Sequence, residues 1–335
     1  MFFSFKSNKM LFMFTLFFST LISISANSWF GCWIGLEINL LSFIPLISNS
    51  KNLLSNEAAL KYFLVQSIAS INFLFLILLE MTFIKSLNNI LSIMMNLPLL
   101  MKMGSTPFHF WFPNISEGMS WTNNFILMTW QKISPMILLS YFFNKNFLIF
   151  ILIMNSIIGA LGGLNQTSLR KIMAFSSINN LSWMISSMMI SENLWLFYFF
   201  LYSLLSGIMC FMFNNFNMYF INQLFILNMN SMLKFSFLIN FLSLGGLPPF
   251  IGFFSKWVVI NFLMINNFMF ISFIFIMMSL IMLFFYIRIS YSSLMLNYLK
   301  LKWFKFFFKN KNNNFINLIT MTSITGMIFS NSFFI

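Results

Sequence analysis

Residues 234–265 read KFSFLINFLSLGGLPPFIGFFSKWVVINFLMI. This apolar run is longer than the roughly 20 residues that one transmembrane helix needs. Gly245-Gly246 and Pro248-Pro249 interrupt it near its middle, and both residue types disrupt a helix. Inside a bilayer, non-helical backbone is tolerated only where protein or water surrounds it. The stretch therefore predicts a broken membrane-spanning helix, with Lys256 in its second half.

The composition of the whole chain agrees with a membrane location. Of 335 residues, 60% are hydrophobic and only 7% are charged, and the mean hydropathy is +0.88. An ordinary soluble domain has about 25% charged residues. These values exclude a soluble enzyme, a secreted scaffold and a disordered linker, and they indicate an integral membrane protein.

Apolar runs of spanning length recur along the sequence and predict eleven transmembrane helices. Because the runs are continuous and long, they exclude the short alternating strands of a membrane barrel. The first run, which follows Lys6 and Lys9 and ends at Ser25-Ala26, is also compatible with a signal peptide. That alternative is weaker because Trp29 opens another span almost at once. The predicted spans are 10–26, 29–48, 57–80, 87–104, 121–141, 147–164, 172–190, 193–216, 234–265, 268–289 and 314–334.

The distribution of basic residues predicts the orientation of the chain. Eleven lie in loops on the side of the N-terminus, whereas Lys85 and Lys145 lie on the other side. Positive loops face the compartment from which the protein is inserted, so the N-terminus should lie there and the C-terminus opposite. The polybasic loop 291–313 could orient the chain against anionic headgroups or dock a partner subunit. The eleven residues are Lys6, Lys9, Lys51, Arg170, Lys171, Lys234, Lys300, Lys302, Lys305, Lys309 and Lys311.

Redox chemistry within this chain is not expected. Cys32 and Cys210 are the only cysteines and His109 is the only histidine. Iron–sulfur clusters need several thiolates, and two cysteines make no disulfide framework. We therefore expect no cofactor and no metal in this chain, and a bilayer-bound loop makes nucleic-acid binding implausible.

Four charged residues lie inside predicted spans, where a charge is costly and usually functional. Glu37 and Lys132 lie near the middle of their spans, and Lys132 is followed by Pro135, which should disturb the helix and free carbonyl groups. Lys102 precedes a helix break and could also reach the interface by snorkelling. Lys256 follows the Gly-Gly and Pro-Pro pairs. For Glu37 the alternative is a structural pair with a lysine elsewhere in the membrane.

These four charges predict a proton relay. A buried lysine can gain or lose its proton when a nearby charge moves. Three of the four charges are ammonium groups, which repel sodium ions, so the set favours proton transport over cation transport. His109, in the loop after the first break, could gate proton entry or could be a structural loop histidine.

Two breaks share a short pattern and suggest an internal repeat. GSTPF at 104–108 and GLPPF at 246–250 both match G-x-x-P-F, in the fourth and the ninth predicted spans. Spans one to five and six to ten would then form two units. Because each unit has an odd number of helices, the repeats would be inverted, as in many transporters. We expect repeats over about 10–141 and 147–290 within one polytopic membrane domain 1–335, with broken helices near 87–112 and 234–265 and one further C-terminal helix.

Several longer motifs resemble a known family. Together they look like the antiporter-like proton-pumping subunit 2 family of mitochondrial NADH:ubiquinone oxidoreductase, respiratory complex I, over about residues 26–290. The bias toward Phe, Ile and Asn resembles that of an insect or similar invertebrate mitochondrial gene. The motifs are GLEINL at 35–40, PFHFW at 107–111, TWQK at 129–132, GLNQTSLRK at 163–171 and LGGLPPF at 244–250.

The resemblance implies eleven helices, an inner-membrane location and an N-terminus in the matrix, with the C-terminus in the intermembrane space. It implies that Glu37 pairs with Lys102, that Lys132 is central and that Lys256 faces the next half-channel. NADH, FMN, iron–sulfur clusters and ubiquinone would bind partner subunits, and neighbouring antiporter-like subunits and an anionic lipid such as cardiolipin are expected partners. Relatives often have histidine where this chain has Asn180, and asparagine cannot carry a proton.

Two other functions remain open from the residues alone. A freestanding cation/proton antiporter would share the fold, and a structural subunit could use the buried charges only for assembly. The cost of burying Lys132 argues against the structural reading unless a carboxylate lies permanently beside it.

Overall fold

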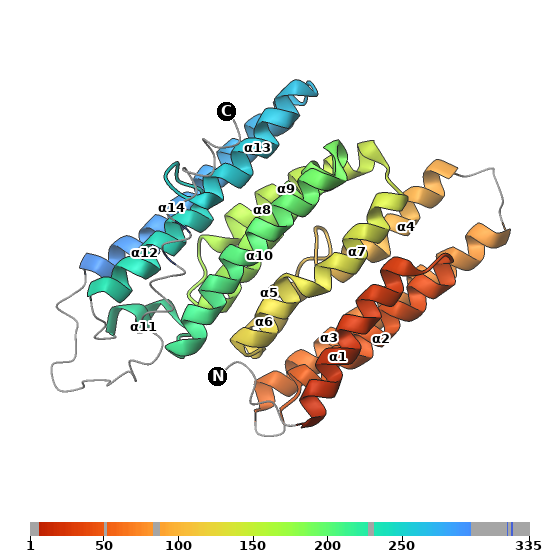
Figure 1. Ribbon diagram of the computed structural model, residues 1–335, viewed down its shortest axis with the longest axis horizontal. Coiled ribbons are helices and arrows are strands. Elements are labelled where there is room, and N and C mark those ends of the chain that lie inside the picture. The colour runs from red at the N-terminus through yellow and green to blue at the C-terminus, as the bar shows by residue number, and fades with distance from the viewer. Residues whose placement is uncertain are drawn as a thin grey trace. The chain divides into compact units, whose positions relative to one another are not determined.

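The computed structural model describes residues 7–49, 52–82, 88–226 and 231–295, together with residues 320 and 323 (Figure 1). The predicted last span and residues 296–313 of the polybasic loop lie outside this part of the chain, apart from those two positions. The contacts divide the chain into two compact units, residues 1–151 and residues 152–335.

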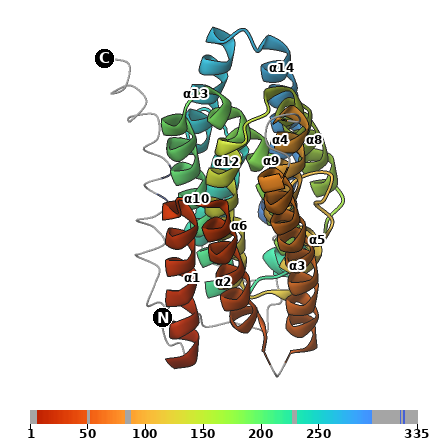
Figure 2. The ribbon, with the colours of Figure 1, turned by 90° about the vertical axis from the view of Figure 1, so that its right-hand side faces the viewer.

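The first unit begins with three helices that lie side by side (Figures 1 and 2). Close packing of the first two depends on Gly35, because a Cβ atom there would lie 2.7 Å from the backbone nitrogen of Ser23. Small residues at such crossings let helix backbones approach in membranes. The helices of this unit are α1 (Ser7–Ser25), α2 (Trp29–Ile47), α3 (Leu53–Thr82), α4 (Asn88–Met103), α5 (Trp111–Gly118), α6 (Trp121–Met128) and α7 (Trp130–Tyr141).

The second unit has the same all-helical character. Gly159 of α8 lies against α9, where a Cβ atom would meet the backbone nitrogen of Asn179 at 2.6 Å. One isolated β-bridge joins Ser168 to Phe220. The helices are α8 (Lys145–Gly163), whose first turns precede the unit boundary, α9 (Leu169–Ile190), α10 (Glu192–Asn215), α11 (Ile221–Ile226), α12 (Ser231–Gly245), α13 (Ile251–Ile265) and α14 (Met269–Met295).

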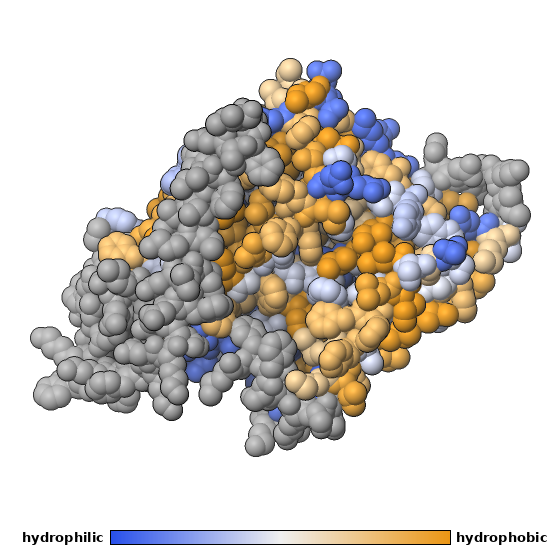
Figure 3. Space-filling view, in the orientation of Figure 1, coloured by the Kyte–Doolittle hydropathy of each residue, from blue (hydrophilic) through white to orange (hydrophobic). Residues whose placement is uncertain are grey.

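Five of the described helices are long and apolar enough to cross a membrane, namely α2, α3, α8, α10 and α14. Shorter apolar helices cover residues 9–25, 90–103, 234–245 and 251–265. Large apolar side chains face outward, and Leu11 and Ile71 are both 64% exposed. In the coloured part of Figure 3, hydrophobic residues form broad patches. The chain is therefore an all-helical membrane protein, while the total of eleven spans remains a prediction.

Both predicted breaks are present, and both end their first helix in the same way. Gly104 has φ +70° and Gly246 has φ +87°, the left-handed conformation that glycine adopts without strain. The following N–H then bonds back to a carbonyl five residues earlier, as in a Schellman motif. These bonds run from Ser105 to Leu100 (3.1 Å) and from Leu247 to Leu242 (3.3 Å).

The predicted span 121–141 is divided at a different place from the one the sequence indicates. Pro135 lies inside α7, and the helical path is instead interrupted at Thr129, where φ is −115° and ψ is −74°. The Thr129 hydroxyl donates a 2.7 Å hydrogen bond to the carbonyl of Phe125, a type of bond that bends helices. Pro135 does not end the helix, and the expectation that it frees a carbonyl group beside Lys132 stays a prediction.

Candidate functional site

Lys132 is the most deeply buried of the predicted charges, with 1% of its surface exposed. It lies in the first turn of α7, directly after the interruption at Thr129. Its Nζ atom lies 5.3 Å from the centroid of the Phe112 ring, which belongs to α5. An ammonium over an aromatic face is attracted by the ring quadrupole, whose face is negative although the ring is neutral overall. Phe112 also packs on Gly104, because a Cβ atom there would meet its Cδ2 at 2.8 Å.

A chain of amide and phenol groups connects α7 to two other helices beside Lys132. The Nε2 group of Gln131 donates to Oδ1 of Asn39 on α2 at 3.0 Å. The Tyr62 hydroxyl of α3 donates to Oε1 of Gln131 at 3.4 Å. All three side chains are buried. Because buried polar groups need partners, this network fixes the position of α7 and of the lysine next to it.

Lys102 lies in the last turn of α4 and is 6% exposed. Its carbonyl accepts a 3.2 Å hydrogen bond from Nε2 of Gln66, on α3. Glu37, half-buried on α2, acts on the Lys102 ammonium electrostatically. Between these two described residues no direct ion pair forms, since their charged atoms are more than 4.0 Å apart. Their partnership in proton transfer remains a prediction.

Lys256 holds together the two halves of the broken helix in the second unit. Its Nζ atom donates to the carbonyl of Gly245 at 2.8 Å and to that of Leu244 at 3.4 Å. These carbonyls belong to the last turn of α12, which carries the negative end of the helix dipole. A Cβ atom at Gly246 would lie 3.0 Å from the same Nζ atom. Lys256 therefore caps α12 from the first turns of α13.

A small cavity of about 10 Å³ adjoins Lys256, which is about the space of one water molecule. Asn180 faces it and accepts a 2.8 Å hydrogen bond from the Tyr198 hydroxyl, while its own amide donates to the Ser176 carbonyl at 2.9 Å. The complete lining is Asn180, Tyr198, Tyr202, Leu205, Leu244, Gly252, Ser255 and Lys256.

Sequence analysis missed the two tyrosines in this lining. Tyr198 and Tyr202 are buried and stand four residues apart on α10. Residues at this spacing share one helix face, so the sequence could show that the two tyrosines lie together but not that their face adjoins Lys256.

His109 lies in the turn between α4 and α5 and is 7% exposed. Its ring lies 4.2 Å from that of Phe110, centroid to centroid. The first unit therefore contains Glu37, Lys102, His109 and Lys132, and the second contains Lys256. Within the described residues, no group of three or more His, Cys, Asp or Glu residues could hold a metal ion. Cys32 and Cys210 are buried free thiols.

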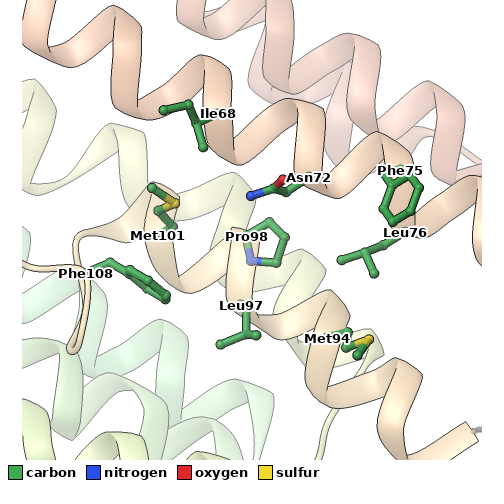
Figure 4. A pocket seen from close by; sticks show the side chains of 9 residues that line it. All are labelled: Ile68, Asn72, Phe75, Leu76, Met94, Leu97, Pro98, Met101 and Phe108. Carbon is green, nitrogen blue, oxygen red and sulfur yellow. The ribbon is translucent and has the colours of Figure 1, made fainter.

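A separate groove of about 340 Å³ lies between α3 and α4, beside the first break (Figure 4). Asn72 contributes its only polar side chain and points toward Pro98 of α4. Ile68, Phe75 and Met94 are exposed at its edge, so the groove opens on an apolar outer face. The remaining lining is Leu76, Leu97, Met101 and Phe108.

Comparisons with known proteins agree on one family. Residues 26–282 match the family model described as NADH:quinone oxidoreductase/Mrp antiporter, TM. The chain is 50% identical to NADH-ubiquinone oxidoreductase chain 2 of Anopheles gambiae, over 96% of this chain and 97% of that protein. It is 43% identical to the protein of the same name in Locusta migratoria, over 98% and 97% of the two chains.

The fold is similar to that of solved membrane complexes. A chain of respiratory complex I from Thermus thermophilus aligns with a TM-score of 0.81 and 18% identity, over 96% of this chain and 77% of that one. A chain of the Mrp complex from Dietzia aligns with a TM-score of 0.73 and 15% identity, over 83% and 59%. At these identities the structures establish the shared antiporter-like fold.

Proposed function

This chain belongs to the NADH:quinone oxidoreductase/Mrp antiporter transmembrane family, and from that premise we propose that it is a proton-carrying membrane-arm subunit of an NADH:ubiquinone oxidoreductase. Insect relatives that bear this oxidoreductase name match nearly the whole chain at 43–50% identity. NADH, FMN, iron–sulfur clusters and ubiquinone bind other subunits, and this chain moves protons while those subunits move electrons.

Lys132 is the central proton carrier of the proposal. It is 1% exposed, and a buried ammonium in a membrane protein is expensive unless transport uses it. Lys132 lies directly after the interruption at Thr129 that separates α6 from α7, and its ammonium lies over the Phe112 ring. This position, in a helix that does not run straight through the membrane, is the observation that carries the proposal.

In this proposal the proton passes along the four charged residues of the predicted relay in sequence order. An electrostatic change along the membrane arm alters the interaction between Glu37 and Lys102. The altered charge on Lys102 then changes the affinity of Lys132 for its proton, and the proton leaves by way of Lys256. Moving one charge against 100 mV costs about 2.3 kcal/mol, so quinone chemistry in other subunits must drive each step.

Release of the proton from Lys256 would also change the contact between α12 and α13. As an ammonium it donates to the Gly245 and Leu244 carbonyls, and these contacts are charge-assisted. Loss of its proton removes that assistance and loosens the contact between α12 and α13. One water in the adjoining cavity would receive or supply the proton.

The expected location is the inner mitochondrial membrane, with the N-terminus in the matrix and the C-terminus in the intermembrane space. Basic loops on the N-terminal side support this orientation. The partners are the other subunits of the same oxidoreductase, above all the neighbouring antiporter-like subunits. The two repeats, about 10–141 and 147–290, would each supply one half of the proton path.

Substitution of Lys132 tests the relay. We expect Lys132→Ala to lower the number of protons pumped per electron, measured with the intact oxidoreductase in liposomes during NADH oxidation. Lys61→Ala is the matched control, because Lys61 is a half-exposed lysine paired with Glu57 on the surface of the same unit. Unchanged pumping per electron in Lys132→Ala would refute the relay.

A freestanding cation/proton antiporter is the second candidate, favoured by the likeness to the Mrp complex chain. Native electrophoresis of solubilised inner membranes separates the two. The oxidoreductase proposal expects this chain in the band that oxidises NADH, in fixed ratio to flavin- and cluster-bearing subunits. A small separate band without them would favour the antiporter.

A further inference from the structure

A cavity of about 540 Å³ lies at one end of the second unit, away from Lys256. It is formed by the loop between α8 and α9 together with the last turns of α14. Leu164 and Ile289 give it an apolar wall, while the loop contributes polar side chains. The complete lining is Leu164, Asn165, Gln166, Thr167, Ile221, Arg288 and Ile289.

The loop that forms this cavity is tied down at three places. The Leu169 N–H donates to the Tyr219 carbonyl at 2.9 Å, and the Ile221 N–H donates to the Thr167 carbonyl at 3.1 Å. The Arg288 guanidinium donates to the Leu164 carbonyl. These hydrogen bonds connect the loop to two separate segments, residues 219–221 and α14, and they fix the position of one wall of the cavity.

The surroundings of the cavity are positively charged. Arg288 lines it, Arg170 stacks on the Tyr219 ring with 4.6 Å between guanidinium carbon and ring centroid, and Lys171 follows in sequence. The positive end of the α9 dipole lies here, because α9 begins at Leu169. Glu192 is the only acidic residue of 152–335, and it begins α10 after α9 has crossed to its other end. Among the residues of this unit that the structure describes, no acidic side chain other than Glu192 is present to compete for the cations.

The position of Arg288 along α14 is the one expected for a side chain in the headgroup layer of a bilayer. The stretch of α14 from Met269 to Arg288 has the roughly 20 residues that cross the hydrocarbon core. We therefore expect Arg288 near the end of that core, three residues before the candidate span Met269–Tyr291 ends.

We propose that this cavity binds the phosphate of an anionic phospholipid. A guanidinium presents five donors in a planar fork that matches phosphate oxygens, and only one contact, to the Leu164 carbonyl, is used internally. The polar groups of Asn165 and Thr167 face the glycerol and headgroup hydroxyls, and the apolar wall takes the start of the acyl chains. The volume falls in the range of pockets that enclose a ligand of this size. The site does not depend on the proton relay.

The test uses the intact oxidoreductase in nanodiscs and follows hydrogen exchange of peptides that cover residues 163–171. Nanodiscs of phosphatidylcholine alone are compared with nanodiscs that also contain phosphatidylglycerol. We expect several-fold slower exchange of this loop with phosphatidylglycerol. Inorganic phosphate added to the phosphatidylcholine nanodiscs should give no such protection, because it lacks the acyl chains.

Two variants locate the effect. Arg288→Gln should abolish the protection, and Lys145→Gln, which removes a basic residue that begins α8 at its other end, should preserve it. If Arg288→Gln does not assemble, Arg288→Lys keeps the charge but replaces the planar fork by a single ammonium nitrogen, and should weaken the protection several-fold. Equal protection by inorganic phosphate would overturn the lipid assignment in favour of a free anion. Protection that persists in Arg288→Gln and Arg288→Lys, or that depends on an acidic partner subunit instead of lipid, would overturn the site.

Discussion

Phe112 and Lys132 come from different helices and meet with 5.3 Å between the ring centroid and the ammonium nitrogen. The ring belongs to α5, which begins after the break that follows α4, and the lysine belongs to α7, which begins after the interruption at Thr129. The break after α4 and the interruption at Thr129 thus both lie next to the buried ammonium of Lys132. The aromatic face attracts the ammonium electrostatically, so this contact helps to hold the charge in place.

Replacing Phe112 tests this contact. Phe112→Leu keeps an apolar side chain but removes the aromatic face, and a desolvated cation–π contact contributes about 2 kcal/mol. We expect lower pumping per electron and a lower temperature of half-inactivation of the purified oxidoreductase. Phe110→Leu is the control, since Phe110 lies in the same turn and is 72% exposed. Equal behaviour of the two variants would show that the ring does not hold Lys132.

The adjacent glycines of the second break should respond very differently to alanine. Gly246 has φ +87°, and a Cβ atom there would press on Lys256 at 3.0 Å. A Cβ atom at Gly245 would meet its nearest neighbour at 3.5 Å, an ordinary contact. We expect Gly246→Ala to destabilise the oxidoreductase by about 1–3 kcal/mol, the usual cost of such backbone strain, and Gly245→Ala to be tolerated. Thermal inactivation of both variants measures the difference, and similar losses would contradict the cap geometry.

Sequence reasoning found the breaks after α4 and α12 because their causes are local. Glycine with positive φ and proline act on the backbone wherever they stand, and both are visible in GSTPF and GLPPF. In the span 121–141 the sequence drew attention to Pro135 and not to Thr129, because proline is a local signal of a disturbed helix and threonine is not. The conformation at Thr129 arises from its hydroxyl bond to Phe125 and from packing that no local pattern encodes.

The sequence predicts the charged residues of the candidate site but not the uncharged residues that line it. Glu37, Lys102, Lys132 and Lys256 are conspicuous in apolar spans because a charge there is costly. Tyr198 and Tyr202 resemble ordinary apolar residues of such spans, and only the fold shows that they share a cavity with Lys256. The role of Lys256 as a helix cap also required the structure, since it depends on the direction in which the chain turns after Gly246.

Tyr198 provides a test of the polar cluster around Asn180. Tyr198→Phe removes the hydroxyl that donates to Oδ1 of Asn180, and a buried acceptor left without its donor costs about 1–3 kcal/mol. We expect a lower temperature of half-inactivation and slower proton pumping. Tyr141→Phe is the control, because Tyr141 is 58% exposed. No change in Tyr198→Phe would mean that another donor replaces the hydroxyl.

Two substitutions of Lys256 separate its structural contact from its proposed proton chemistry. Lys256→Gln keeps a donor that can reach the carbonyls of Gly245 and Leu244, but an amide cannot carry a proton at physiological pH. Lys256→Met fills similar space and offers no donor, so the last carbonyls of α12 lose a partner. We expect both variants to lose pumping per electron, and only Lys256→Met to lose thermal stability, by about 1–3 kcal/mol. Pumping that survives in Lys256→Gln would remove Lys256 from the relay while leaving it as a helix cap. Equal stability of the two variants would show instead that the cap contributes little and that the residue is retained for its proton.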